Sequence, residues 1–227
     1  MPDYFIPGLN PLILSLKLAG VTTLLLILVA TPLAWWLSQT KNIFKPFFEA
    51  IVALPLVLPP TVIGFYMLIL LGPEGFIGRS WIGMGGDTLT FSFSGLVIAS
   101  MVYSLPFVVQ PIQNAFEGIG RHVLESAWTL GARPLGAFFS VIIPLSAKGY
   151  LTALVLGFAH TLGEFGIVLM VGGNIPDKTR VISIAIYDHV ETLDYSYAHM
   201  LSAGMLIFSL LLLISVYLIN HRWRIRT

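Results

Sequence analysis

The stretch RHVLESAWTLGARPLGAFFSVIIPLS, residues 121–146, decides how the rest of this chain is arranged. It predicts two short helices separated by a turn. The first runs from about residue 122 to 130 and stops at Gly131, because glycine readily takes the left-handed backbone with which helices end. The second begins near Pro134, since proline suits the first turn of a helix. It is predicted to end before Pro144, which has no N–H to donate to a continuing helix.

Apolar side chains gather on one face of the first helix, at Val123, Leu124, Ala127 and Leu130. Glu125 and Thr129 lie off that face. Such a helix can pack on a membrane domain while it presents its other surface to a soluble partner. A plain amphipathic connector would show the same pattern, so the pattern alone leaves both interpretations open.

The chain as a whole has the composition of an integral membrane protein. Of its 227 residues, 56% are hydrophobic and 10% are charged, and the mean hydropathy is +0.88, whereas a soluble domain carries about 25% charged residues. No basic patch with interleaved aromatic residues occurs, which argues against a nucleic-acid partner. The chain contains no cysteine, so disulfides and cysteine–metal sites are excluded.

Five segments are long and apolar enough to cross about 30 Å of membrane lipid. They are residues 12–37, 50–71, 95–115, 149–171 and 199–219. The first is too long for a cleaved signal peptide and is interpreted as a retained span. The connections, of about 30 residues or fewer, are too short for a second domain. The predicted fold is therefore all-α, a polytopic membrane protein with a single domain over residues 10–221.

The distribution of lysine and arginine predicts the orientation, because loops rich in these residues stay in the cytoplasm. One side carries Lys41, Lys45, Arg121, Arg133, Lys148, Arg222, Arg224 and Arg226. The other side carries Arg79, Lys178 and Arg180 and the acidic residues Asp3, Glu74, Asp87, Asp177, Asp188, Glu191 and Asp194. Five spans then place the N-terminus outside and the C-terminus in the cytoplasm, with loop 121–146 on the cytoplasmic side.

Prolines interrupt the second and third spans. The second contains Pro55, Pro59 and Pro60, and the third contains Pro106 and Pro111. Each proline leaves a backbone carbonyl without its helical partner, and lipid cannot supply one. Both spans are therefore predicted to be broken or kinked against protein or water. They are either bent packing helices or the walls of a pathway that changes shape.

The fourth span combines small residues with the only acidic residue inside a predicted span. Ala153, Gly157 and Thr161 recur every four residues, a spacing that lets helices approach closely. His160 and Glu164 are also four apart and are predicted to share one face of the helix. A carboxyl group within a span rarely faces lipid, so Glu164 is a candidate functional residue.

No sequence motif for chemical catalysis is present. No GxxxxGK[ST] phosphate loop occurs, so the chain is not an ATPase, and no Ser/His/Asp or HExxH pattern indicates another enzyme. Asp188, Glu191 and Asp194 lie three apart, which is typical of a solvated acidic face rather than of a metal site. Spans two to five lack interior lysine and arginine, so a pathway through them would hold an anion weakly. Capture and selection would then reside in another protein.

Loop 121–146 resembles the cytoplasmic loop signature of ABC importer permeases, through Glu125-Ser126-Ala127, three residues, Gly131, nine residues and Val141-x-Ile143-Pro144. The family form is Glu-Ala-Ala, three residues, Gly, nine residues and Ile-x-Leu-Pro. This chain departs from it at Ser126, Val141 and Ile143, and each change keeps size and helix compatibility. The resemblance implies a loop that docks on an ATPase subunit and passes its motion to the spans. The residues implied in that coupling are Glu125, Ser126, Ala127, Gly131 and Pro144.

Three further stretches resemble the molybdate branch of that family. They are LPLVLPPTVIG at 54–64, GFIG at 75–78, and LGEFG at 162–166 with GNIP at 173–176 and TR at 179–180. The resemblance covers about residues 50–192, and tungstate and sulfate permeases share much of the pattern. Some relatives carry a further N-terminal span, whereas this chain is expected to begin with the span at Leu12.

The resemblance implies a type I ABC importer permease for molybdate in the cell inner membrane, which works as a homodimer above two ATPase subunits. ATP would bind to those subunits, so no cofactor is expected on this chain. An extracytoplasmic binding protein, periplasmic or a lipoprotein, would deliver the anion. The candidates for the pathway or its gate are Pro55, Pro59, Pro60, His160 and Glu164. The alternatives are a secondary anion carrier, a permease for tungstate or sulfate, and a non-transporting assembly factor.

A bare carboxylate at Glu164 would repel a dianion on such a pathway. The repulsion would be avoided if the group were protonated, or if it were held by His160 or by N–H groups of a broken neighbouring helix. Either arrangement would make Glu164 a structural fastener close to the outer gate. The rival interpretation is that Glu164 titrates during transport, as in a proton-coupled carrier.

Overall fold

The computed structural model describes residues 9–224, and every regular element in that range is a helix. In chain order they are α1 (Leu9–Gln39), α2 (Lys45–Ala53), the 3-10 turn η1 (Leu54–Leu56), α3 (Pro60–Leu71), α4 (Phe76–Gly83), α5 (Phe93–Ile119), α6 (Arg121–Thr129), α7 (Pro134–Ala137), the π-helical segment η2 (Phe138–Ile142), α8 (Ile143–Leu145), α9 (Ala147–Gly163), α10 (Gly166–Gly172), α11 (Ile182–Glu191) and α12 (Tyr195–Arg224). The predicted all-α class is confirmed. Asp3 and Arg226, used above for the orientation, lie outside the described residues.

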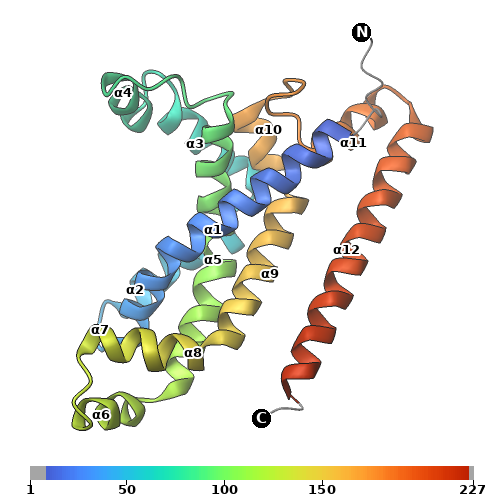
Figure 1. The fold of residues 1–227 in the computed structure, drawn as a ribbon. Helices are drawn as coiled ribbons and strands as arrows, with labels where there is room; N and C mark the ends of the chain where they lie inside the picture. Colours follow the sequence, from blue (N-terminus) through green and yellow to red (C-terminus); the bar gives the residue numbers. More distant parts are fainter. Residues whose placement is uncertain (1–8, 225–227) are drawn as a thin grey trace.

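Helix α1 crosses the molecule obliquely and packs against both α5 and α9 (Figure 1). Its buried face includes Leu18, Leu26, Ala30, Ala34 and Leu37. The small-residue spacing predicted in α9 is confirmed, because Ala153, Gly157 and Thr161 are all buried. A Cβ atom on Gly157 would lie 2.6 Å from Cγ2 of Val108 in α5. Only glycine therefore lets α9 come this close to α5.

The second predicted span is broken, as its prolines indicate. The chain passes from α2 through η1 to Pro59, whose backbone is extended (ψ 137°), and α3 then starts at Pro60. The third span is not broken, because α5 runs through Pro106 and Pro111 without interruption. Each proline removes only one helical hydrogen bond, and packed neighbouring helices let a span tolerate that loss. Of the two outcomes predicted for the third span, the break is wrong.

The fourth predicted span, 149–171, is two helices rather than one, and the sequence interpretation did not foresee this break. Helix α9 ends at Gly163, Glu164 has an extended backbone (φ −70°, ψ 135°), and α10 begins at Gly166. Gly166 lies directly against α3, since a Cβ atom there would be 2.9 Å from Cβ of Pro60. The two broken spans therefore meet at their breaks.

Loop 121–146 contains the predicted first helix, α6, followed by Gly131 with φ +86°. The predicted end of the second helix is wrong, because α7, η2 and α8 run on through Pro144. The N–H of Ile143 reaches back to the carbonyl of Phe138, five residues earlier. This wider π turn makes room for the ring of Pro144, which would press on a carbonyl in a regular α turn. A bend of 69° then separates α7–α8 from α9.

Helix α12 stands to one side of the body and contacts mainly α11 (Figure 1). Only 11% of its apolar stretch is buried, against 56% for α5. By length and composition, residues 9–224 contain four helices that could cross a membrane, or five if the bent pair 134–145 and 147–163 is one span. The larger of these two numbers agrees with the five predicted spans, although the bounds of the spans differ from those predicted.

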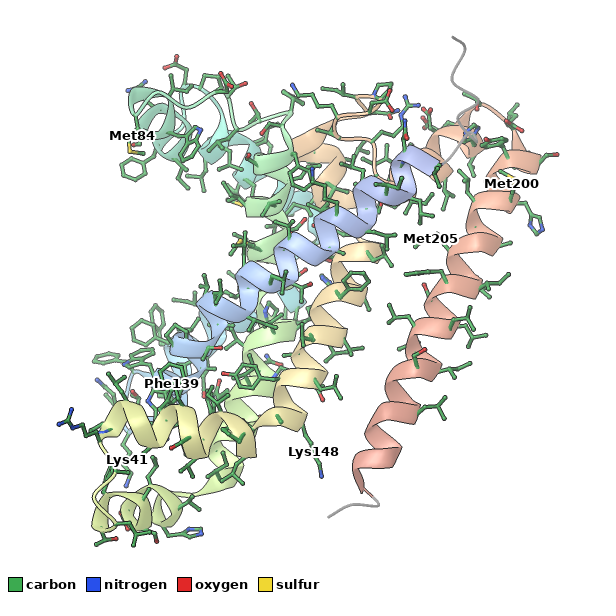
Figure 2. The ribbon with its side chains drawn as sticks, viewed as in Figure 1. Lys41, Met84, Phe139, Lys148, Met200 and Met205 are labelled. Atoms are coloured by element: carbon green, nitrogen blue, oxygen red, sulfur yellow. The ribbon has the colours of Figure 1, made fainter. Side chains whose placement is uncertain are left out.

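The two ends of the molecule carry different residues. Figure 2 shows Lys41 and Lys148 at the end formed by α6 and α7, and Met84 and Met200 at the opposite end, near α4 and α11. We call these the α6 end and the α11 end. The two lysines therefore share an end, as the charge distribution predicts.

Candidate functional site

A pocket of about 620 Å³ opens where the two broken spans meet. Its walls come from the start of α3, the middle of α5 and the junction of α9 with α10, and its polar lining residues are Thr61, Tyr103, His160 and Glu164. Three of the five predicted pathway residues, Pro60, His160 and Glu164, thus line one pocket. Pro59 is the exposed residue that caps α3, and Pro55 is buried in η1. We call this the break pocket.

Glu164 is the most unusual residue of the break pocket. Only 4% of its surface is exposed, and neither carboxyl oxygen has a hydrogen-bond partner among the described residues. Ser100 of α5, whose hydroxyl is also buried without a partner, is close enough to interact with the carboxyl but lacks hydrogen-bond geometry. An ionised carboxylate without a partner would be costly in this environment.

The backbone of Glu164 is held more firmly than its side chain. Its carbonyl accepts a hydrogen bond of 2.6 Å from the hydroxyl of Ser183 in α11. The break between α9 and α10 is therefore fastened to α11, which also contacts the start of α1 through Ser15 and Ile182 (2.8 Å).

His160 does not pair with Glu164. Helix α9 ends before Glu164, so the predicted shared helical face is wrong. Nδ1 of His160 lies 2.9 Å from Oγ of Ser104, which lies 2.9 Å from Oγ1 of Thr161. The imidazole also stacks on Phe107, with ring centroids 3.9 Å apart. No N–H group reaches the carboxyl within residues 9–224, so neither predicted partner is found, and protonation of Glu164 stays a prediction.

The residues matched to the loop signature form an exposed surface at the α6 end. Glu125 and Ser126 are exposed, whereas Ala127 is half-buried and packs near the buried Leu124. Leu130 departs from the predicted apolar face, because 89% of its surface is exposed. Other exposed apolar side chains of this loop are Trp128, Leu135 and Phe139. Gly131 and Pro144 are exposed as well, so the loop presents both polar and apolar groups.

Charged groups pair in two further places. At the α6 end, Nζ of Lys45 lies 2.9 Å from Oε1 of Glu117 and 3.6 Å from Oε1 of Glu49. The hydrogen bond to Glu117 raises the pKa of Lys45 above its ordinary value. At the α11 end, Arg180 lies 3.7 Å from Asp188. Within residues 9–224, no group of three or more histidine, aspartate or glutamate side chains is arranged to hold a metal ion.

Thr61 and Tyr103 line the break pocket but are absent from the predicted site residues. Thr61 directly follows Pro59-Pro60, so the start of a helix after a double proline is a signal that could have identified it. Tyr103 carries no such signal. It is one of eight tyrosines, and the packing of α5 against α9 brings it to the pocket.

Residues 19–225 match the family model described as the binding-protein-dependent transport system inner membrane component. The chain belongs to this family. As a member of the binding-protein-dependent transport family, it is a multi-pass inner membrane component and a transport subunit rather than an enzyme.

Curated relatives include permeases for two kinds of oxyanion. The molybdenum transport system permease protein ModB of Azotobacter vinelandii is 57% identical over 204 residues, which cover 90% of each chain. ModB of Escherichia coli (strain K12) is 37% identical over 186 residues, covering 82% of this chain and 81% of the relative. A probable sulfate transport system permease protein, cysT of Zygnema circumcarinatum, is 35% identical over 210 residues, which cover 90% of this chain and 71% of the relative.

Two solved structures share the fold. A bacterial ABC transporter involved in the import of the acidic polysaccharide alginate has a TM-score of 0.72 at 19% identity, covering 95% of this chain and 78% of that chain. An amino acid ABC transporter has a TM-score of 0.61 at 18% identity, and the match covers 95% of this chain and 93% of that chain. At these identities the likeness concerns the fold alone, and it confirms the predicted ABC importer transmembrane fold.

Proposed function

We propose that this chain is the permease subunit of an ATP-driven ABC importer that moves molybdate across the cytoplasmic membrane. The observation that carries the proposal is the 57% identity, over 90% of both chains, with a molybdenum permease. The sulfate permease is only 35% identical over a similar share of this chain. Molybdate is therefore favoured over sulfate as the transported anion.

The proposed assembly is a permease homodimer with two ATPase subunits at the α6 end. The exposed surface around Glu125, Ser126 and Gly131 docks on the ATPase, which binds and hydrolyses the ATP. Support comes from the loop signature and from the exposure of these residues. An extracytoplasmic binding protein captures the anion and delivers it at the α11 end, since no lysine or arginine lines the break pocket.

Uptake of molybdate at trace concentration tests the function. A strain that lacks this chain is expected to lose the uptake and to regain it when the chain is expressed with its ATPase partner. Competition by excess tungstate or sulfate then ranks the anions. Uptake that survives inactivation of every ATPase subunit would instead support a secondary anion carrier, and failure to co-purify with an ATPase would point the same way.

The proposed orientation places the α6 end in the cytoplasm, and the absence of native cysteine allows a direct test. A cysteine introduced by Asn42→Cys is expected to be shielded from an impermeant thiol reagent in intact cells. One introduced by Asp177→Cys, at the α11 end, is expected to react. The reverse pattern would invert the orientation.

A further inference from the structure

The start of α3 leaves one helix-terminal donor open at the break pocket among the described residues, since the N–H groups of Val62 and Ile63 both donate to the carbonyl of Pro59. Pro59 occupies the cap position without any side-chain hydrogen bond, and Pro60 has no N–H. The N–H of Thr61, the first donor of the helix, has no partner within residues 9–224. This free N–H group and the positive end of the helix dipole favour an anion at this place.

Side chains around the pocket add neutral donors rather than charges. Thr61 and Tyr103 each contribute a hydroxyl, and His160 contributes its second ring nitrogen. Nδ1 of His160 lies 2.9 Å from the hydroxyl of Ser104; in the tautomer in which Ser104 donates to Nδ1, the proton of the neutral imidazole is on Nε2. The pocket thus offers several O–H and N–H groups and no lysine or arginine.

Glu164 gives an independent indication of a ligand. Buried polar groups in folded proteins almost always have hydrogen-bond partners, yet both oxygens of this carboxyl have none within residues 9–224. In its protonated form, Glu164 carries one O–H to donate and no negative charge. A ligand rich in acceptor oxygens would satisfy this donor without electrostatic repulsion.

We propose that the break pocket is a transient binding site for a tetrahedral oxyanion, held by neutral donors and by the N-terminus of α3. The site deepens the proposed function and rests on it, because it places the transported dianion on its way through the permease. Discontinuous membrane helices often direct their N-termini at anionic substrates. Without a cation the binding is weak, which suits a site that the substrate must leave.

Protection of an introduced cysteine tests the site in the assembled transporter. Met170→Cys places a single thiol on the pocket lining, and Met84→Cys places one at the exposed position that directly follows α4. Millimolar molybdate or sulfate is expected to slow modification at position 170 and not at position 84, whereas chloride of the same ionic strength should protect neither. Protection by sulfate but not by molybdate would overturn the proposed function and keep the site. Protection by neither anion would overturn the site.

Removal of the donors gives a second, independent test. Thr61→Val combined with Tyr103→Phe deletes two hydroxyls, and loss of a hydrogen bond to a charged partner is expected to lower molybdate uptake about tenfold or more. Thr152→Val combined with Tyr66→Phe makes the same changes at exposed positions outside the pocket. Wild-type uptake in the pocket variant, with normal ATPase assembly, would overturn the site. Absence of molybdate uptake in the unmodified transporter would instead overturn the proposed function.

Discussion

Two regions of this molecule depend on glycine for opposite reasons. In the body, Gly157 is required because it lacks a side chain, since a Cβ atom there would lie 2.6 Å from Val108 while the backbone is ordinary helix. In loop 121–146, Gly131 is required for its backbone, which has φ +86°, while a Cβ atom would meet nothing within 4 Å. One position is limited by space and the other by a dihedral angle.

The carboxylates of the two regions show the same difference. The carboxyl group of Glu164 is buried at a helix break with no hydrogen-bond partner in the described part of the chain, whereas Glu125 is exposed on α6. Packing thus decides what the body tolerates, and the presentation of surface groups decides what the loop tolerates. The same kind of substitution, such as glycine to a larger residue, is therefore expected to have a different effect in each of the two regions.

The largest effect is expected from Gly157→Leu. The added side chain collides with α5 and α1, and overpacking of this kind costs roughly 1–3 kcal/mol or more. We expect little folded permease in the membrane, measured as monodisperse protein after detergent extraction and by its thermal midpoint. Gly20→Leu in α1 is the matched control, because a Cβ atom there meets nothing within 4 Å. Equal losses in both variants would show that crowding against α5 is not the cause.

Gly131→Val is expected to leave a folded permease that has lost transport. A branched side chain disfavours the left-handed backbone by roughly 1–2 kcal/mol, which displaces the surface that carries Glu125. Co-purification of the ATPase and molybdate uptake are the measurements. Gly131→Asn should restore both in part, since asparagine tolerates this backbone. Gly136→Val, in the same loop with open space and no positive φ, is the control. Normal ATPase co-purification and normal uptake in the Gly131→Val transporter would contradict the proposal that this loop docks on the ATPase.

Glu164→Gln is expected to keep substantial transport, because glutamine stays neutral and keeps most of the hydrogen-bonding capacity of a protonated carboxyl. Glu164→Ala should lower thermal stability or uptake, as it leaves a cavity beside Ser100. Glu74→Gln provides the same charge change at an exposed position outside both the break pocket and loop 121–146. If Glu164→Gln abolishes uptake at normal expression and assembly, the hypothesis of a neutral carboxyl is wrong. That result would support a proton-coupled role for Glu164.

The smallest effect is expected from Lys45→Met at the α6 end. Its partly exposed ion pair with Glu117 contributes at most about 1 kcal/mol. Because the pKa of Lys45 is raised from 10.5, this stabilisation is present below that value and is lost as the pH rises through the raised pKa. The thermal midpoint at neutral and at alkaline pH measures it. Lys41→Met, at a residue without an ion pair in the described part of the chain, is the control, and an equal change in both variants would contradict the pairing.

Local signals in the sequence were enough for the elements that depend on backbone chemistry. The stop at Gly131, the break of the second span at its prolines and the close approach at Gly157 all follow from residue type and spacing. The helix through Pro144 was missed, because a π turn depends on how the loop packs and not on the proline alone.

The break at Glu164 could not be predicted for a related reason. Gly163 and Gly166 flank the break, but the apolar run continues through residues 149–171, so the segment was interpreted as one helix. The extended backbone there follows from contacts with distant residues, namely Pro60 in α3 and Ser183 in α11. The break pocket joins three separate parts of the chain, and for that reason the sequence pointed to His160 and Glu164 but not to Tyr103.

Helix α1 is synthesised first but meets some of its partners last. Asn10 and Ser15 bond to Asp177 and Ile182, each 167 residues later in the chain. At about 5–20 residues per second, the ribosome needs roughly 10–30 s to supply them.

During that interval, three hydroxyl groups of α1 have partners within the helix itself. Ser15, Thr23 and Thr31 donate to the carbonyls of Pro11, Ala19 and Ile27, each four residues earlier. These bonds need no other helix, so α1 can enter the bilayer without unpaired hydroxyls at these positions before α9 and α11 exist. The hydrogen bonds within α1 therefore suit a helix that is synthesised before its partners.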